Sequence, residues 1–133
     1  MNTNTVIIND IQPEDIIKYN FKRLLTKKDT IIWKNCCNLK IIINSKINKI
    51  IFENCKNIEL TMTHAVIGVE LNNSHNFLIN IKKHLNSFEA YKSSVRLNQR
   101  LNQRLNQKTF FFCEKTKIKQ SAWKSPSLPP DSQ

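Results

Sequence analysis

Apolar and polar positions alternate along short segments in the middle of this chain, and the segments recur every 19 residues. Leu39, Ile41 and Ile43 form one such alternating set, which predicts a strand with one buried and one solvated face. The apolar positions related by the 19-residue step are Trp33, Phe52 and Leu71; Leu39, Ile58 and Phe77; Ile41, Leu60 and Ile79; Ile47, Val66 and Leu85; and Ile50, Val69 and Phe88. A fixed period near 20 residues combined with alternation predicts a chain wound into stacked β coils.

Polar positions obey the same step. They are Asn35, Asn54 and Asn73; Asn38, Asn57 and Asn76; and Cys36, Cys55 and Ser74. Coils stacked about 4.8 Å apart would place each set in a column, where asparagines can bond to one another and adopt the left-handed conformation of tight turns. We interpret the asparagines as structural, with a polar binding ladder as the alternative. Cys36 and Cys55 are interpreted as small buried thiols, with a disulfide as the alternative.

The period divides the chain into three parts. Residues 1–30 form an N-terminal segment and a first irregular coil, residues 31–120 the solenoid, and residues 121–133 a proline-containing tail predicted to be disordered. Val6–Ile8 is predicted as a strand. Residues 13–25 fit either a helix with Ile17, Phe21 and Leu24 on one side, or another degenerate coil.

The C-terminal part of the solenoid departs from the period. Val95 and Leu97 take the places of Phe77 and Ile79 if one turn is a residue shorter. Three copies of Arg-Leu-Asn-Gln follow, and we interpret residues 98–107 as an expanded loop, with an amphipathic helix through Leu97, Leu101 and Leu105 as the alternative. Residues 109–113 are predicted as an apolar strand, and residues 115–119 as its return in a hairpin or as an edge strand.

The formal net charge is +11, which favours acidic partners such as a protein surface, nucleic acid or an anionic membrane. The abundance of Asn, Ile and Lys is also typical of a genome biased toward A and T, which would raise the lysine content without selection for binding. Aromatic residues are 8% of the chain and mostly occupy predicted core positions, so a stacking platform for nucleic acid is not expected.

Composition also argues against several kinds of binding and catalytic site. The single glycine excludes glycine-rich phosphate loops, and no Cys or His spacing fits a zinc site, so we expect neither cofactor nor metal. No catalytic set stands out, and His64, His75 and His84 are predicted to be surface residues of turns. The sequence contains no run of 18 apolar residues and does not begin like a secretory signal, so we expect a cytoplasmic protein with reduced cysteines.

Two segments of the repeat resemble a known family. Residues 46–57, Lys-Ile-Asn-Lys-Ile-Ile-Phe-Glu-Asn-Cys-Lys-Asn, and residues 67–74, Ile-Gly-Val-Glu-Leu-Asn-Asn-Ser, resemble successive motifs in the C-terminal domain of cyclase-associated proteins, within the superfamily that includes tubulin-folding cofactor C. The resemblance implies an all-β, right-handed parallel β-helix that binds monomeric actin and assists filament turnover. It also implies a homodimer formed by exchange of a C-terminal hairpin, for which the candidate residues are Phe110, Phe111, Phe112 and Ile118.

The first functional hypothesis is therefore a non-enzymatic module that binds actin monomers. Candidate partner-binding residues are the charged strand and turn residues Lys46, Lys49, Glu53, Lys56 and Glu70, acting as a polar rim on a flat sheet. An alternative is a GTPase-activating domain like cofactor C, in which Arg96 would act as an arginine finger, although Ser94 stands where that branch carries glutamine. A basic β-helix scaffold without actin activity is the remaining alternative.

Overall fold

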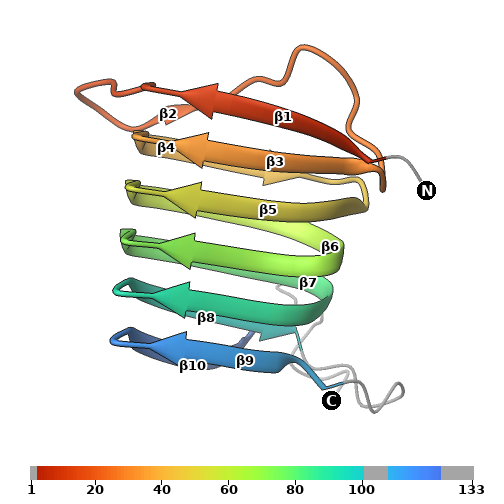
Figure 1. Cartoon of the computed structure of the whole chain (residues 1–133), viewed down its shortest axis with the longest axis vertical. Coiled ribbons are helices and arrows are strands. Elements are labelled where there is room, and N and C mark those ends of the chain that lie inside the picture. Colours follow the sequence, from red (N-terminus) through yellow and green to blue (C-terminus); the bar gives the residue numbers. More distant parts are fainter. Residues whose placement is uncertain (1–2, 101–107, 124–133) are drawn as a thin grey trace, which may run out of the picture.

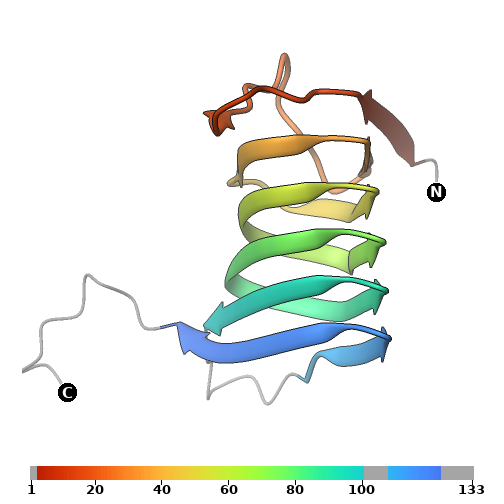
Figure 2. The same ribbon diagram turned by 90° about the vertical axis from the view of Figure 1, so that its left-hand side faces the viewer.

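The described part of the chain, residues 3–100 and 108–123 of a computed structural model, winds into one right-handed solenoid of β-strands (Figures 1 and 2). The strands are β1 (Asn4–Asn9), β2 (Ile17–Lys18), β3 (Asp29–Lys34), β4 (Cys37–Ile43), β5 (Ile47–Glu53), β6 (Lys56–Asn72), β7 (His75–Tyr91), β8 (Ser94–Arg100), β9 (Phe110–Glu114) and β10 (Lys117–Trp123). All pairings between these strands are parallel. The predicted parallel β-helix is confirmed.

The solenoid has two flat faces, which we call facet A and facet B. Facet A is built from β1, β3, β5, the C-terminal parts of β6 and β7, and β9. Facet B is built from β2, β4, the N-terminal parts of β6 and β7, β8 and β10. Tight turns join the facets along one side, the narrow edge, whereas β6 and β7 bend continuously from one facet to the other along the opposite side, the wide edge (Figure 2).

Columns of apolar side chains fill the space between the facets. Trp33 pairs in register with Phe52, and Phe52 with Leu71, as the 19-residue step predicts. The rings of Trp33 and Phe52 are stacked with centroids 5.9 Å apart, and Phe52 meets Phe77 edge to face at 4.9 Å. These side chains are almost completely buried, so the repeated apolar positions form a continuous core along the axis.

One predicted column is wrong at its central residue. Ile47 pairs with Ala65, not with Val66, and Ala65 in turn pairs with Leu85. Ala65 is buried, whereas Val66 is 37% exposed. The cause is a pair of register shifts on the wide edge, where successive coils are 18 and then 20 residues long. A bend without a tight turn can absorb an inserted or deleted residue, because it need not repeat one backbone geometry.

The narrow edge repeats one geometry. Asn35, Asn54, Asn73 and their neighbours Asn38, Asn57 and Asn76 all have positive φ angles, a conformation that asparagine adopts more readily than most residues. Asn73 donates a hydrogen bond from Nδ2 to Asn54 Oδ1 over 2.7 Å, and Asn76 donates likewise to Asn57 over 3.3 Å. The structural interpretation of the asparagine columns is confirmed.

The cysteine column has the same structural role. Cys36 and Cys55 are free buried thiols, as predicted, and each donates to the backbone carbonyl two residues before it at 3.3 Å. Ser74 does the same with the carbonyl of Asn72 at 3.0 Å, and its Oγ also accepts the N–H of Cys55 at 3.2 Å. The sequence reading missed the next two members of the column, Ser93 and Thr116. The interaction between the two thiols lowers the pKa of Cys36 to about 7 and raises the pKa of Cys55.

The N-terminal segment is the degenerate coil, not the helix. β1 pairs with β3, and the two residues of β2 pair with Leu39 and Lys40 of β4. Tyr19 and Phe21 pack edge to face over Trp33, with centroids 4.9 and 6.0 Å from its ring. Leu24, which the helical alternative placed on the apolar side, is 90% exposed. Aromatic residues therefore cover the first end of the core without a repeating pattern.

The C-terminal strands form a further coil instead of a hairpin. β9 pairs parallel with β7 and β10 pairs parallel with β8, so the predicted hairpin is wrong. The alternative, an edge strand, is confirmed for residues 117–119, because among the described strands β10 pairs only with β8. Residues 98–100 belong to β8 and not to a loop, and Leu97 lies in the same strand, which excludes the helical alternative at that residue. Residues 121–123 belong to β10 instead of the tail. The remaining predictions for the loop and tail, at residues 101–107 and 124–133, lie outside the described residues.

Candidate partner-binding surface

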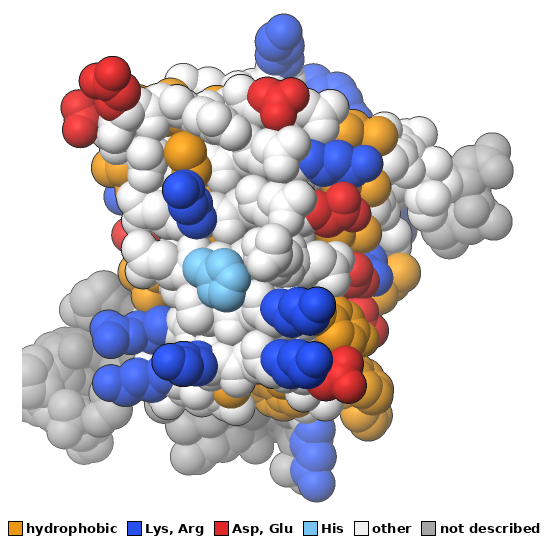
Figure 3. All heavy atoms as spheres, turned by 60° about the vertical axis from the view of Figure 1, so that its left-hand side comes forward, with side chains coloured by type: hydrophobic (Ala, Val, Ile, Leu, Met, Phe, Trp, Pro, Cys, Tyr) orange, Lys and Arg blue, Asp and Glu red, His pale blue; other side chains and the backbone are white. Residues whose placement is uncertain are grey.

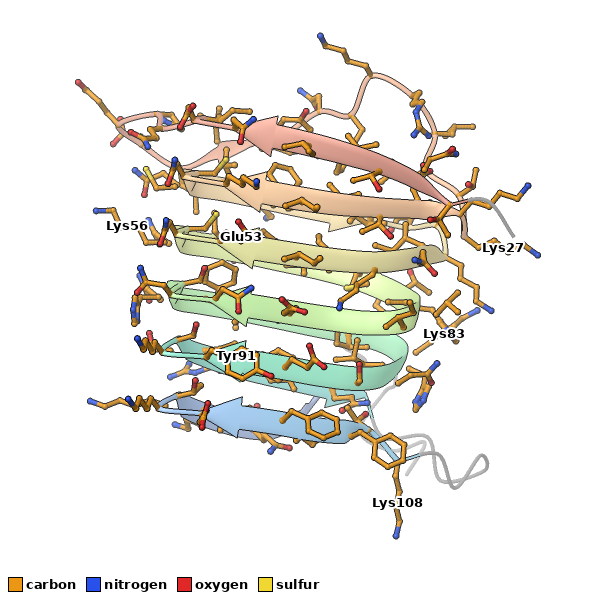
Figure 4. All side chains as sticks on the ribbon, in the orientation of Figure 1. Lys27, Glu53, Lys56, Lys83, Tyr91 and Lys108 are labelled. Carbon is orange, nitrogen blue, oxygen red and sulfur yellow. The ribbon has the colours of Figure 1, made fainter. Side chains whose placement is uncertain are left out.

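Facet A carries both basic and acidic side chains. Its outward charged side chains among the described residues are two lysines and four glutamates, Lys34, Lys49, Glu53, Glu70, Glu89 and Glu114. Lys49 Nζ lies 2.9 Å from Glu70 Oε1, and Lys34 Nζ lies 3.9 Å from Glu53 Oε2. The lysines of facet A therefore already have partners within the facet. Glu53 and Tyr91 face the viewer from this facet in Figure 4.

Glu70 and Glu89 lie side by side on facet A, because they occupy the same register position in β6 and β7. Burial raises the pKa of Glu70, but hydrogen bonds from Asn72 and Lys49 outweigh burial and hold the pKa below its usual value. The hydrogen bond between the two carboxyl groups, aided by burial, raises the pKa of Glu89. The contact therefore moves the pKa values of the two carboxyl groups in opposite directions.

Apolar residues occupy both ends of facet A. Ile7, Ile32 and Ile51 stand in one register column at the N-terminal end. At the C-terminal end, Phe110 and Phe112 project from β9 and are 68% and 54% exposed. Facet A is therefore acidic at its centre and apolar at its ends.

Facet B is basic. Its outward charged residues among the described positions are six cations and one carboxylate, Lys18, Lys40, Lys56, Arg96, Lys117, Lys119 and Glu59. The carboxylate of Glu59 lies 3.5 Å from Lys40 Nζ. In Figure 3, which brings the narrow edge forward, apolar and acidic side chains are interspersed with basic ones down the right-hand side, toward facet A, and a group of basic side chains lies at the lower left, toward facet B.

A shallow groove of about 580 Å³ runs along facet B. The charged residues lining it are Arg96, Lys117, Lys119 and Glu59, and the carboxylate of Glu59 is paired with Lys40. Its apolar lining includes Ile16, Leu78 and Ile118. Beside the groove a row of polar side chains is bonded from coil to coil: Asn98 donates to Asn80 over 2.9 Å, and Ser121 donates to Asn98. This row fixes the strands that carry the cations.

The wide edge carries a histidine pair. The rings of His64 and His84 meet edge to face with centroids 6.0 Å apart. Burial, followed by the positive charges of Lys46, His84 and Lys83, lowers the pKa of His64. His84 is only 9% exposed, so its prediction as a surface residue is wrong. The alternation in β7 breaks at this point, which turns the imidazole of His84 inward next to Leu85.

The five predicted partner-binding residues do not share one face. Lys49, Glu53 and Glu70 lie on facet A, Lys46 lies on the wide edge, and Lys56 lies at the corner of the narrow edge and facet B, as Figure 4 shows for Glu53 and Lys56. The structure brings together Lys49 and Glu70, which pair with each other. Sequence reasoning missed Lys117 and Lys119 of the groove and considered Arg96 only as an arginine finger.

The described part of the chain contains neither a metal-binding cluster nor a membrane-spanning helix. Among residues 3–100 and 108–123, no three His, Cys, Asp or Glu side chains gather where they could hold a metal ion. Within the same residues, no helix is long and apolar enough to cross a membrane.

Comparison with known proteins identifies the family. The family described as adenylate cyclase-associated protein (CAP) C terminal matches residues 3–95, which is more than half of the chain. The chain belongs to the CAP C-terminal domain family. A crystal structure of cyclase-associated protein from Cryptosporidium parvum has the same fold, with a TM-score of 0.73 at 15% identity, over 92% of this chain and 73% of that one. No curated protein sequence matches the chain.

Membership in the CAP C-terminal family places the chain among actin-binding regulators of the cytoskeleton, and the family is a binding domain. The position that the alternative GTPase-activating hypothesis assigns to glutamine holds Ser94, whose Oγ accepts the N–H of Asn76 at 2.9 Å. Arg96 is exposed on β8, two residues further on. An arginine-finger role stays a prediction, which stimulated GTP hydrolysis and its loss in Arg96→Ala would test.

Proposed function

We propose that this chain is a non-enzymatic module of the cytoplasm that binds monomeric actin and assists filament turnover. The observation that carries the proposal is the match of residues 3–95 to the CAP C-terminal family. The net charge of +11 supports it, because actin is acidic and complementary charge accelerates and orients association. The flat facets also suit a protein surface better than a small molecule, which usually needs a deep cavity.

Titration of fluorescently labelled actin monomers with the purified chain tests this function. We expect saturable binding that weakens as salt is raised, because exposed charges are screened over about 8–10 Å near physiological ionic strength. Faster nucleotide exchange on the bound actin would extend the result to filament turnover. Absence of saturable binding at low and physiological salt would leave the basic scaffold as the better description.

We also propose that two copies associate through the C-terminal coil. Phe110, Phe111 and Phe112 are exposed on β9, and Ile118 is half-buried at the same end of the core. Among the described strands, β9 pairs only with β7 and β10 only with β8, so the outer edges of both are unpaired. An apolar open end with free backbone groups is a template for another chain.

Sedimentation velocity over a range of protein concentrations tests the dimer. We expect a concentration-dependent dimer in the parent chain and a monomer in the variant Phe110→Ser/Phe112→Ser. The matched control is Ile7→Ser, which removes an exposed apolar side chain at the opposite end of facet A. Loss of the dimer in the control but not in the β9 variant would contradict the proposed interface.

A further inference from the structure

The net charge of the chain is divided unevenly between its two facets. Facet A presents two lysines against four glutamates, whereas facet B presents six cations against the single carboxylate of Glu59, counted over the described outward residues. A lysine content set only by genome composition would distribute lysines over both facets alike. The division therefore marks facet B as a surface with its own partner.

The cations at the C-terminal end of facet B lie next to one another on the neighbouring strands β8 and β10. Arg96 and Lys119 are directly opposite in the parallel pairing of β8 and β10, and Lys117 lies two residues before Lys119. The ion pairs seen among the described residues involve Arg23, Lys34, Lys40 and Lys49, and none involves these three cations. Like charges opposite each other on neighbouring strands destabilise a sheet. An anionic partner would remove this repulsion on binding.

The groove between these cations adds apolar contacts. Leu78 and Ile118 line it together with Arg96, Lys117 and Lys119, and Ile16 lines it from the N-terminal coil. Glu59 also lines the groove, but its carboxylate is already paired with Lys40. An occupant that follows the groove crosses several coils along the solenoid axis. A chain segment with carboxylates on one side and apolar side chains on the other matches both kinds of lining.

The observations favour a protein over other polyanions. Among the described side chains of facet B, no exposed Phe, Tyr or Trp ring is available for stacking with bases, which single-stranded nucleic acid sites use. A membrane surface favours protruding apolar residues, whereas Leu78 and Ile118 of facet B line a hollow and are only partly exposed. The groove instead combines a partly apolar centre with charged residues, as protein interfaces do.

We propose that facet B is the docking surface for actin, and that an acidic segment of the actin monomer lies along the groove lined by Arg96, Lys117 and Lys119. The proposal rests on the proposed function. It assigns actin to facet B, whereas most of the residues predicted from the sequence lie on facet A.

The test is a titration of labelled actin monomers with two facet B variants and one control. Lys117→Glu/Lys119→Glu reverses two charges in the groove, and Lys27→Glu/Lys28→Glu makes the same change in net charge on exposed residues before β3. We expect the groove variant to weaken actin binding at least about 10-fold, because like charges then face each other across the interface. The control should change binding by less than about 3-fold, the effect of net charge alone.

The second groove variant separates binding from folding. Arg96→Gln/Lys119→Gln removes a like-charge pair, so we expect its midpoint of thermal unfolding to be equal to or above that of the parent chain, while its affinity for actin falls about 10-fold. If these residues had only a structural role, the substitution would lower the unfolding midpoint and the affinity for actin together, or would change neither.

Each outcome decides the proposal. Equal affinity of the parent chain and both groove variants for actin would overturn facet B as the docking surface and leave the proposed function standing. Failure of the parent chain to bind actin would overturn both. A parallel titration with a single-stranded oligonucleotide tests nucleic acid as the alternative occupant of the groove. If the groove variants lost oligonucleotide binding while their actin binding was unchanged, the groove would be assigned to nucleic acid and the proposal would be overturned.

Discussion

Gly68 lies directly against Ser87 of the next coil, so closely that a Cβ atom at Gly68 would lie 2.1 Å from the backbone oxygen of Ser87 and 2.5 Å from its Oγ. The two residues are in register between β6 and β7, at the point where the pairing recovers from the register shift of the wide edge. The single glycine of the chain thus stands where two backbones approach too closely for any side chain.

Gly68→Ala should therefore destabilise the solenoid by about 3 kcal/mol, the upper range for an inserted group in a packed region. Urea unfolding followed by circular dichroism measures the loss. Addition of Ser87→Ala to the variant removes the Oγ atom but not the closer backbone oxygen, so we expect little rescue. Full rescue by Ser87→Ala would show that the side chain, and not the backbone approach, requires glycine.

Asp29 gives the fold a pH dependence at its N-terminal end. Its buried carboxylate accepts hydrogen bonds from Arg23 Nη2 at 2.7 Å, Arg23 Nη1 at 3.0 Å and the N–H of Thr26 at 2.7 Å. The bonds from Arg23 are the main cause that lowers the pKa of Asp29 to about 2; burial opposes them, and the bond from Thr26 assists. Because this pKa lies below that of the unfolded chain, the stabilisation is complete above about pH 4 and is lost as the pH falls toward 2.

Asp29→Asn should reduce the free energy of unfolding at pH 7 by about 2 kcal/mol, the value of a shift of that size. The difference from the parent chain should shrink as the pH falls to 2. The control is Asp15→Asn, at an exposed position, which should leave the unfolding curve unchanged at both pH values. A destabilisation of Asp29→Asn that persists in full at pH 2 would contradict the role of the ionised carboxylate.

The column of small side chains on the narrow edge predicts which substitutions the turns accept. Ser74 Oγ accepts the N–H of buried Cys55 and donates to the carbonyl of Asn72. Ser74→Ala leaves a buried N–H without its partner and should cost about 1–3 kcal/mol. Ser74→Cys keeps a weak donor and acceptor of similar size, as Cys36 and Cys55 do, and should cost less than half as much. Denaturant unfolding of both variants measures the difference, and equal losses would show that volume alone matters at this position.

The sequence predicts this fold well wherever the coils share one turn geometry. Asparagine in the left-handed conformation and a small donor two residues after a carbonyl recur on the narrow edge, and a fixed spacing follows from them. The wide edge has no such requirement, so its coil lengths vary and the assignment of Val66 fails by one residue. Periodicity is informative about turns with a repeated backbone and uninformative about bends without one.

The candidate surface was harder to predict because its residues come from a coil that the period does not reveal. Phe88 pairs with Phe111 and Val95 with Ile118, each 23 residues apart instead of 19. The apolar run of β9 and the alternation of β10 fit an antiparallel hairpin equally well, because the side chains of a strand have period 2 in both arrangements. Only the parallel register places Lys119 opposite Arg96, and with it the basic groove of facet B.

Glu70 and Glu89 provide the last prediction. Their hydrogen bond, with burial, raises the pKa of Glu89. Folding therefore favours the protonated form of Glu89, and the free energy of unfolding falls as the pH rises through that pKa. Glu89→Gln keeps a donor toward Glu70 without the charge. It should increase the free energy of unfolding at pH 7 by about 0.5 kcal/mol, the scale of a cross-strand charge pair, and by less at pH 4.

Urea unfolding at the two pH values measures this gain, and Glu114→Gln on the exposed end of the same facet is the control. Both substitutions remove one negative charge from a chain of net charge +11, which by itself increases the repulsion within the fold. Stabilisation by Glu89→Gln but not by Glu114→Gln would therefore arise from the contact with Glu70. If the two variants were equally destabilised, the carboxyl pair would have no energetic role in facet A.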